Sequence, residues 1–130
     1  MTWVAIYKGT TRRVFCVVNL ALKCARNKRG IEANKSEYGV WQNASEVRRD
    51  LLCPSLRLLL GGQILLARRA EPVSEEEFKR DWLKRALAWD YRGPGDESFP
   101  FECKAIDWGK LEGRLVAVDY ANTQALINSD

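Results

Sequence analysis

Residues 12–29, RRVFCVVNLALKCARNKR, decide how the rest of the chain is interpreted. On a helical wheel their apolar side chains share one broad face, and the polar stripe opposite is about 100° wide. The stripe contains Arg12, Asn19, Lys23, Arg26 and Asn27. The pattern predicts a helix over 12–29, capped by Thr10 or Thr11 and closed by Gly30. Such a helix is mostly buried and presents a row of basic and amide groups to solvent.

Charge is unevenly distributed along the 130 residues, which carry 21 basic and 17 acidic side chains. Residues 1–65 hold 11 basic and 4 acidic side chains, whereas residues 66–130 hold 10 and 13. Seven basic residues precede Glu32, the first acidic one. A stretch of one sign produces a field that attracts polyanions. The alternative is that the basic face pairs with the chain's own acidic half, around residues 75–77.

The leading hypothesis is a nucleic-acid-binding protein, with RNA favoured over DNA, that makes phosphate contacts through this basic region. Its candidate cations are Arg12, Arg13, Lys23, Arg26, Lys28, Arg29 and Lys35. Trp3 and Trp41 flank the region, and an exposed indole beside a basic patch can stack on a base. The alternatives are a solvated helix face and two indoles folded over the edge of the core. Trp82 and Trp89 are interpreted as core residues.

The absence of histidine excludes imidazole acid–base chemistry, Ser-His-Asp and Cys-His pairs, and zinc sites that need an imidazole. Cys16, Cys24, Cys53 and Cys103 form no Cys-x-x-Cys pair, so neither a metal nor a cofactor is predicted. Reduced thiols are favoured over disulfides, which indicates the cytoplasm, with the nucleus also open. The apolar run at 14–22 is too short to span a bilayer, so no membrane insertion is predicted.

One short motif points to catalysis. Glu102 and Lys104 form an acidic-x-Lys pair on a predicted strand, and with Asp90 or Asp96 upstream they outline a Mg²⁺-dependent nuclease site. Chance supplies such pairs readily in a chain of this composition. No glycine-rich phosphate loop, nucleophile elbow or kinase signature is recognised. The protein is therefore predicted to be non-enzymatic, with the nuclease as an alternative.

The whole chain, 1–130, is predicted to be a single α+β domain with a helix-rich core and a small sheet of N-terminal and C-terminal strands. The predicted strands are 3–7, 99–106 and 114–120. A loop at 91–100, which contains Gly-Pro-Gly, separates the helical part from the C-terminal hairpin. Ser74 is predicted to cap a helix that extends to about Tyr91.

Two central segments are harder to assign. Residues 30–43 contain two glycines and are interpreted as a loop, after which Asn43 and Glu46 predict a capped helix that ends by Pro54. Segment 56–67, LRLLLGGQILLA, fits either a hairpin around its two glycines or two short helices. Its leucines favour the two helices.

A second functional hypothesis follows from the opposite charges of the two halves. Two copies could pair these halves in a homodimer, which predicts a protein-interaction module such as an inhibitor, an adaptor or a self-assembling subunit. The size and charge suit a small accessory protein of a virus or mobile element. A salt-sensitive oligomer that ignores nucleic acid would favour this hypothesis over the first.

Overall fold

Segment 12–29 forms a β-hairpin, so the helix predicted there is wrong. The computed structural model describes residues 4–89, 100 and 102–121 of the chain. In it β2 (Arg12–Val17) pairs antiparallel with β3 (Leu20–Ala25) along their full lengths. Val18, at φ 55°, lies in the two-residue turn between the strands. A positive φ in such a turn matches the twist of the strands, and the valines of β2 favour extended backbone.

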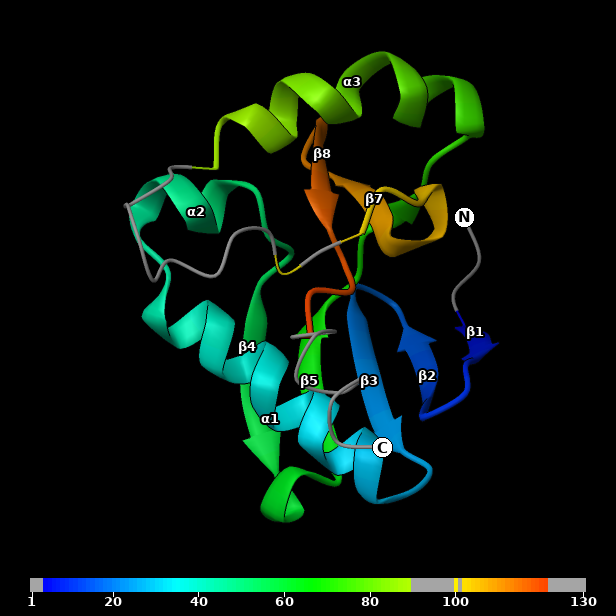
Figure 1. Cartoon of the computed structure of the whole chain (residues 1–130). Helices are drawn as coiled ribbons and strands as arrows, with labels where there is room; N and C mark the ends of the chain where they lie inside the picture. Colours follow the sequence, from blue (N-terminus) through cyan, green and yellow to red (C-terminus); the bar gives the residue numbers. More distant parts are fainter. Residues whose placement is uncertain (1–3, 90–99, 101, 122–130) are drawn as a thin grey trace.

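The hairpin belongs to a five-stranded antiparallel sheet with the order β1-β2-β3-β5-β4 (Figure 1). Its other strands are β1 (Val4–Lys8), β4 (Ser55–Leu59) and β5 (Ile64–Arg68). The described part of the strand predicted at 3–7 is thereby confirmed. For segment 56–67 the preferred pair of helices is wrong and the hairpin is right. The connection between β4 and β5 is a 3-10 turn, η1 (Leu60–Gly62), whose three residues all have positive φ.

One long helix, α1 (Lys28–Asn43), covers a face of this sheet and contacts β3, β4 and β5 (Figure 1). It occupies the segment 30–43 that was interpreted as a loop. Asn27 caps its first turn by accepting the backbone N–H of Gly30 at 3.0 Å. Gly30 therefore begins a helix rather than ending one. A Cβ at this position would lie 2.2 Å from the backbone oxygen of Thr11, so glycine permits the close contact between α1 and the β1–β2 turn.

The helix predicted to begin at Asn43 starts two residues later and is short. It is α2 (Glu46–Asp50), and Ser45 caps it by accepting the N–H of Arg48 at 3.2 Å. Asn43 is instead the last residue of α1. The chain then passes through Pro54 into β4.

The second sheet has three antiparallel strands in the order β6-β7-β8. They are β6 (Glu71–Pro72), β7 (Trp108–Leu111) and β8 (Arg114–Ala117). The strand predicted from residue 114 is present, whereas the described part of 99–106 is no strand and leads into a 3-10 turn, η2 (Ala105–Asp107). Helix α3 (Glu75–Leu87) contacts β8, and Ser74 caps it as predicted, accepting the N–H of Glu77 at 3.1 Å.

These elements confirm the α+β class, but the N-terminal strand β1 and the C-terminal strand β8 lie in two separate sheets rather than in the single small sheet predicted from both ends of the chain. A parallel β-bridge between Leu52 and Ala117 connects the segment before β4 with the end of β8. The main core cluster includes Leu51, Leu52, Phe78, Trp89, Trp108 and Tyr120. Trp82 packs against it, which confirms the interpretation of Trp82 and Trp89 as core residues. Trp3, residues 91–99 and the C-terminal end from residue 122 lie outside the described residues, so what was predicted for them stays a prediction.

Candidate functional site

The interior of the protein contains a fully buried carboxylate, that of Glu37 in α1, with a relative exposure of 0%. Arg12 donates to both of its oxygens, over 3.3 and 3.4 Å. Lys23 donates to it as well, and so does the backbone N–H of Tyr120 at 3.0 Å. Two cations and a backbone amide thus compensate a charge that would be very costly to bury alone.

Burial alone would raise the pKa of Glu37. The charges of Arg12 and Lys23, together with the hydrogen bonds from Lys23 and from Tyr120, outweigh that effect and hold the pKa of Glu37 below its ordinary value. Glu37 is therefore ionised at neutral pH. The carboxylate acts as an anchor that fixes both cations at one place in the interior.

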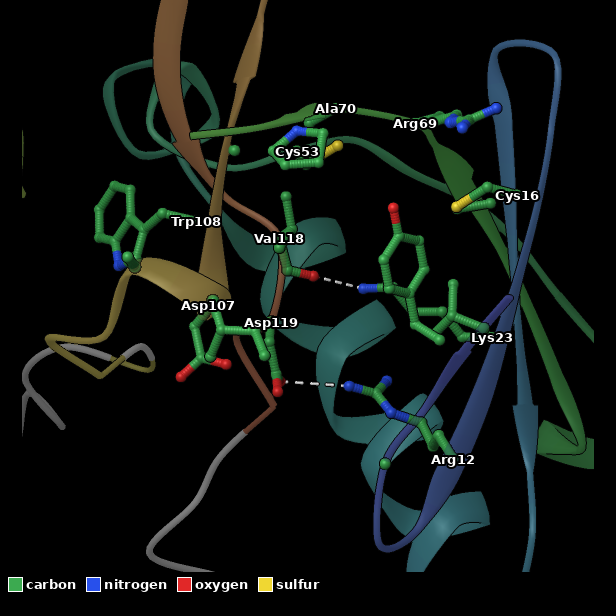
Figure 2. A pocket seen from close by; sticks show the side chains of 18 of the residues that line it. Arg12, Cys16, Lys23, Cys53, Arg69, Ala70, Asp107, Trp108, Val118 and Asp119 are labelled. Carbon is green, nitrogen blue, oxygen red and sulfur yellow. Dashed lines mark hydrogen bonds and ion pairs between the residues drawn. The ribbon is translucent and has the colours of Figure 1, made fainter. Parts of the chain in front are cut away.

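Lys23 reaches Glu37 from β3, in the middle of the five-stranded sheet. Its ammonium group also donates to the backbone oxygen of Val118, which follows β8 (Figure 2). The same nitrogen lies 5.8 Å from the centroid of the Tyr120 ring. Lys23 therefore connects α1, the first sheet and the segment that leaves the second sheet.

Arg12, on the neighbouring strand β2, has three polar partners in the cluster. Besides its two bonds to Glu37, it donates to Asn34 and to Asp119, each over 3.1 Å. Burial would lower the pKa of Arg12, but Glu37 and Asp119 outweigh that effect and raise it. Asn34 in turn donates to the backbone oxygens of Lys23 and Gly62, which holds α1 against the sheet.

Two further carboxylates, those of Asp107 and Asp119, border the cluster formed by Arg12, Lys23 and Glu37 (Figure 2). The backbone oxygen of Asp107 accepts the N–H groups of Val118 and Asp119, at 2.8 and 3.2 Å, so the two acidic residues are held side by side. Burial, followed by the negative charges of Asp119 and Glu102, raises the pKa of Asp107 to about 6. The pair therefore presents concentrated negative charge next to the fixed cations.

A cavity of about 910 Å³ is lined by Arg12, Lys23, Asp107 and Asp119 and extends between the two sheets. Figure 2 shows Arg12, Asp119 and Asp107 at one end of it and Cys53 and Ala70 at the other. Its apolar lining includes Val14, Cys16, Ala21, Cys53, Ala70 and Val118. Residues 68–73, which connect β5 to α3, form one wall. The volume suits a small-molecule ligand, with an apolar end and an end that can bind phosphate or a cation.

The structure separates the basic residues predicted to form one stripe. Arg12 and Lys23 are buried, at 9% and 7% exposure, and the helix on which the stripe depended is absent. Arg13, Arg26, Lys28, Arg29 and Lys35 are exposed. Trp41 is half-buried against the main core, and the Arg49 guanidinium lies 4.8 Å from its ring centroid. Trp3 lies outside the described residues.

Glu102 and Lys104 form an ion pair of 2.9 Å, but they precede η2 instead of lying on a strand. Asp90 and Asp96 lie outside the described residues. Glu102 and Lys104 do affect the pKa of an acidic residue, Asp107, which is not among the predicted site residues. Glu37, Asn34 and Asp119 were also missed. Three features of the sequence mark this group of residues. They are Ala-Leu-Lys at 21–23, the glutamate 14 residues after that lysine, and Asp-Tyr-Ala at 119–121.

Comparisons with protein-family models, with curated proteins and with solved structures found no match. Among the residues that the structure describes, no three His, Cys, Asp or Glu side chains gather into a group that could hold a metal by themselves. No helix in that part of the chain is both long and apolar enough to cross a membrane.

Proposed function

We propose that the cavity binds a nucleoside triphosphate and that the protein is a phosphotransferase of the protein-kinase type. The observation that carries the proposal is the buried ion pair between Lys23, on the third strand of an antiparallel sheet, and Glu37, on the helix that follows it. In protein kinases a lysine of the third strand contacts the nucleotide phosphates and pairs with a glutamate of the next helix. The same pair on equivalent elements supports the same use here.

The order of other residues along the chain supports this proposal. Gly9 lies between β1 and β2, where kinases have a glycine-rich loop over the phosphates. Asp119 and Tyr120 follow β8 and correspond to the first two residues of the kinase motif D-F-G. Glu102 precedes Asp107 by five residues, which is the separation of the catalytic Asp and the metal-binding Asn in H-R-D-x-x-x-x-N.

The chain also departs from that pattern in several places, among them Glu102 in the place of the catalytic Asp. The β1–β2 turn has one glycine, Gly9, instead of three, so a glycine clamp over the phosphates is not part of the proposal. Asp107 takes the place of the asparagine, and Ala121 takes the place of the last glycine of D-F-G. The first of these two exchanges adds a negative charge to the acidic end of the cavity.

Residues at the acidic end fit a magnesium–nucleotide complex. Mg²⁺ is usually held by one or two carboxylates together with phosphate oxygens, and Asp107 and Asp119 lie side by side on the cavity wall. The ion would neutralise charge on the transferred phosphoryl group. Lys23 supplies fixed positive charge to the phosphates. Glu102 is the candidate base for the proton of an acceptor hydroxyl.

A binding titration tests the proposal. The full-length protein is titrated with a fluorescent ATP analogue in MgCl₂, and unlabelled ATP is then added as competitor. We expect saturable binding in the micromolar range, displacement by ATP and weaker displacement by adenosine, because the phosphates meet the charged end of the cavity. Absence of binding at millimolar nucleotide would overturn the proposal.

Nucleic-acid binding remains a second proposal, with a changed set of residues. In the β2–β3 register Arg13 lies opposite Cys24, two residues before Arg26, and α1 begins at Lys28, so exposed basic side chains gather at this end of the sheet. Polyanions are the natural ligands of such a surface. Arg12 and Lys23 do not belong to this set, since both are buried.

Titrating a labelled single-stranded RNA at low and high salt tests the second proposal. Replacing Arg13 and Lys28 by glutamine is expected to weaken binding and to reduce the salt slope by about two, because two phosphate contacts are lost. Glutamines at the exposed Lys79 and Lys84 of α3 are the matched control. No binding at low salt would exclude this function.

A further inference from the structure

The buried cluster contains more positive charge than its central carboxylate needs. Glu37 is fully buried and accepts from Lys23, Arg12 and the Tyr120 N–H. A lysine alone would balance its charge, as in the kinase pair. Arg12 is therefore a second cation, and it lies on the cavity wall next to the first.

The hydrogen-bond partners of Arg12 differ in how deeply they are buried. Its partners Asn34 and Glu37 are both 0% exposed, and the two bonds to Glu37 fix the plane of the guanidinium. Its remaining partner, Asp119, has a side chain that is 47% exposed. Asp119 can therefore turn away from Arg12 with little change in packing, and the donor that it leaves faces the cavity (Figure 2).

Arg12 already balances the negative charge of Asp119, the carboxylate that a bound metal ion would otherwise neutralise. Its nitrogen lies 3.1 Å from an Asp119 carboxylate oxygen, within hydrogen-bond distance. A divalent cation bound to Asp119 has to approach two permanent cations, Arg12 and Lys23, and Coulomb repulsion weakens its binding. A guanidinium with a fixed plane is, in contrast, well suited to hydrogen-bond phosphate oxygens.

We propose that Arg12 is a phosphate-binding residue that takes over part of the role of the divalent cation at Asp119, so that the site retains nucleotide without metal. This inference rests on the proposed nucleotide site and assigns a specific residue within it. The triphosphate accepts from the same Arg12 nitrogen that donates to Asp119 in the structure. Asp119 then becomes available to a metal that arrives with the phosphates.

The experiment compares nucleotide affinity with and without divalent cations. The full-length protein is titrated with the fluorescent ATP analogue in MgCl₂ and, separately, in excess EDTA. We expect the wild type to bind in EDTA within about threefold of its affinity in MgCl₂, a difference well below 1.4 kcal/mol. A loss of wild-type binding in EDTA, with binding in MgCl₂ intact, overturns the role of Arg12 and leaves the proposed function standing. A loss in both conditions overturns both.

Substitutions test whether Arg12 is the residue responsible for nucleotide binding without divalent cations. Arg12→Met is expected to lower affinity about tenfold or more in EDTA and clearly less in MgCl₂, because the metal then compensates Asp119. Arg57→Met is the control, since Arg57 is an exposed arginine on β4 at the opposite edge of the sheet from β1. Equal losses for Arg12→Met in the two conditions overturn the proposal.

Asp119→Asn gives an answer that does not depend on how well Arg12→Met folds. Asp119 is half-exposed, and the asparagine leaves the buried contacts of Arg12 with Glu37 and Asn34 in place. We expect this variant to bind the analogue in EDTA as well as or better than the wild type, and to gain nothing from MgCl₂. Loss of its binding in EDTA would overturn the proposal.

Discussion

Glu37→Gln is expected to lower the free energy of unfolding by about 3–5 kcal/mol, the cost of removing one partner from a buried ion pair. The substitution preserves volume and one acceptor oxygen, but it leaves Arg12 and Lys23 buried without the anion they share. Asp119 compensates only one of them. Urea-induced unfolding followed by circular dichroism measures the change.

A matched substitution on the same helix separates this effect from a general loss of charge. Glu32→Gln removes a carboxylate that is exposed on α1, and such surface changes usually lie within about 0.5 kcal/mol of the wild type. Adding Lys23→Met to Glu37→Gln removes one of the two stranded cations, so the double variant should lose less stability than the sum of the single changes. Additive losses would contradict a shared buried charge.

The stability loss of Glu37→Gln is also expected to depend on pH. The pKa of Glu37 is lowered in the folded state, because Arg12 and Lys23 outweigh burial. For a carboxyl group with a lowered pKa, the stabilising contribution is complete above the unfolded pKa of about 4.3 and disappears as the pH falls through the folded pKa. The stability difference between wild type and Glu37→Gln should therefore be constant from pH 6 to 8 and shrink below about pH 4. An unchanged difference at acid pH would be inconsistent with an ionised Glu37.

Elements set by short-range chemistry could be predicted from the sequence. Ser74, followed by three acidic residues, gave the start of α3, because capping and the helix dipole act within one turn. The β-branched and aromatic residues before Gly9 predicted β1. In both cases the determining contacts lie within a few residues of each other.

The central hairpin could not be recognised by the same reasoning. In 14–25 ten of the twelve residues are apolar, so the two polar ones, Asn19 and Lys23, fall on one side of a helical wheel by chance. The strand alternation is hidden because Arg12 and Lys23 point inward with Cys16 and Ala21, although polar residues ordinarily face solvent. Their burial depends on Glu37, and Glu37 lay in a segment interpreted as a loop. One wrong assignment thus concealed the other.

The candidate site was missed for a related reason. Seven basic residues before Glu32 indicated an external anion, yet the carboxylate partners of Arg12 lie 25 and 107 residues further along the chain. Separations of this size cannot be read from local charge patterns. The individual motifs are short, and only the packing of β3, α1 and the segment after β8 brings Lys23, Glu37 and Asp119 together.

Lys23→Met is expected to lower affinity for the fluorescent ATP analogue by about 10- to 100-fold, since a charge-assisted hydrogen bond contributes about 1.5–3 kcal/mol. In the proposed site this ammonium group contacts the phosphates, and a methionine of similar length fills its place in the sheet without the charge. Lys84→Met, an exposed lysine of α3, is the control and should bind like the wild type. Equal affinity for wild type and Lys23→Met would refute the nucleotide site.

The stability of Lys23→Met distinguishes a binding residue from a structural one. After this substitution Glu37 still accepts two hydrogen bonds from Arg12 and one from the Tyr120 N–H, so the buried anion remains paired. Its loss of stability should therefore be clearly smaller than that of Glu37→Gln, which leaves two cations without their common anion. One of the two cations is enough to keep Glu37 paired, so removing the Lys23 charge is expected to affect the ligand more than the fold. Unfolding of Lys23→Met at the same urea concentration as Glu37→Gln would instead assign Lys23 to the fold.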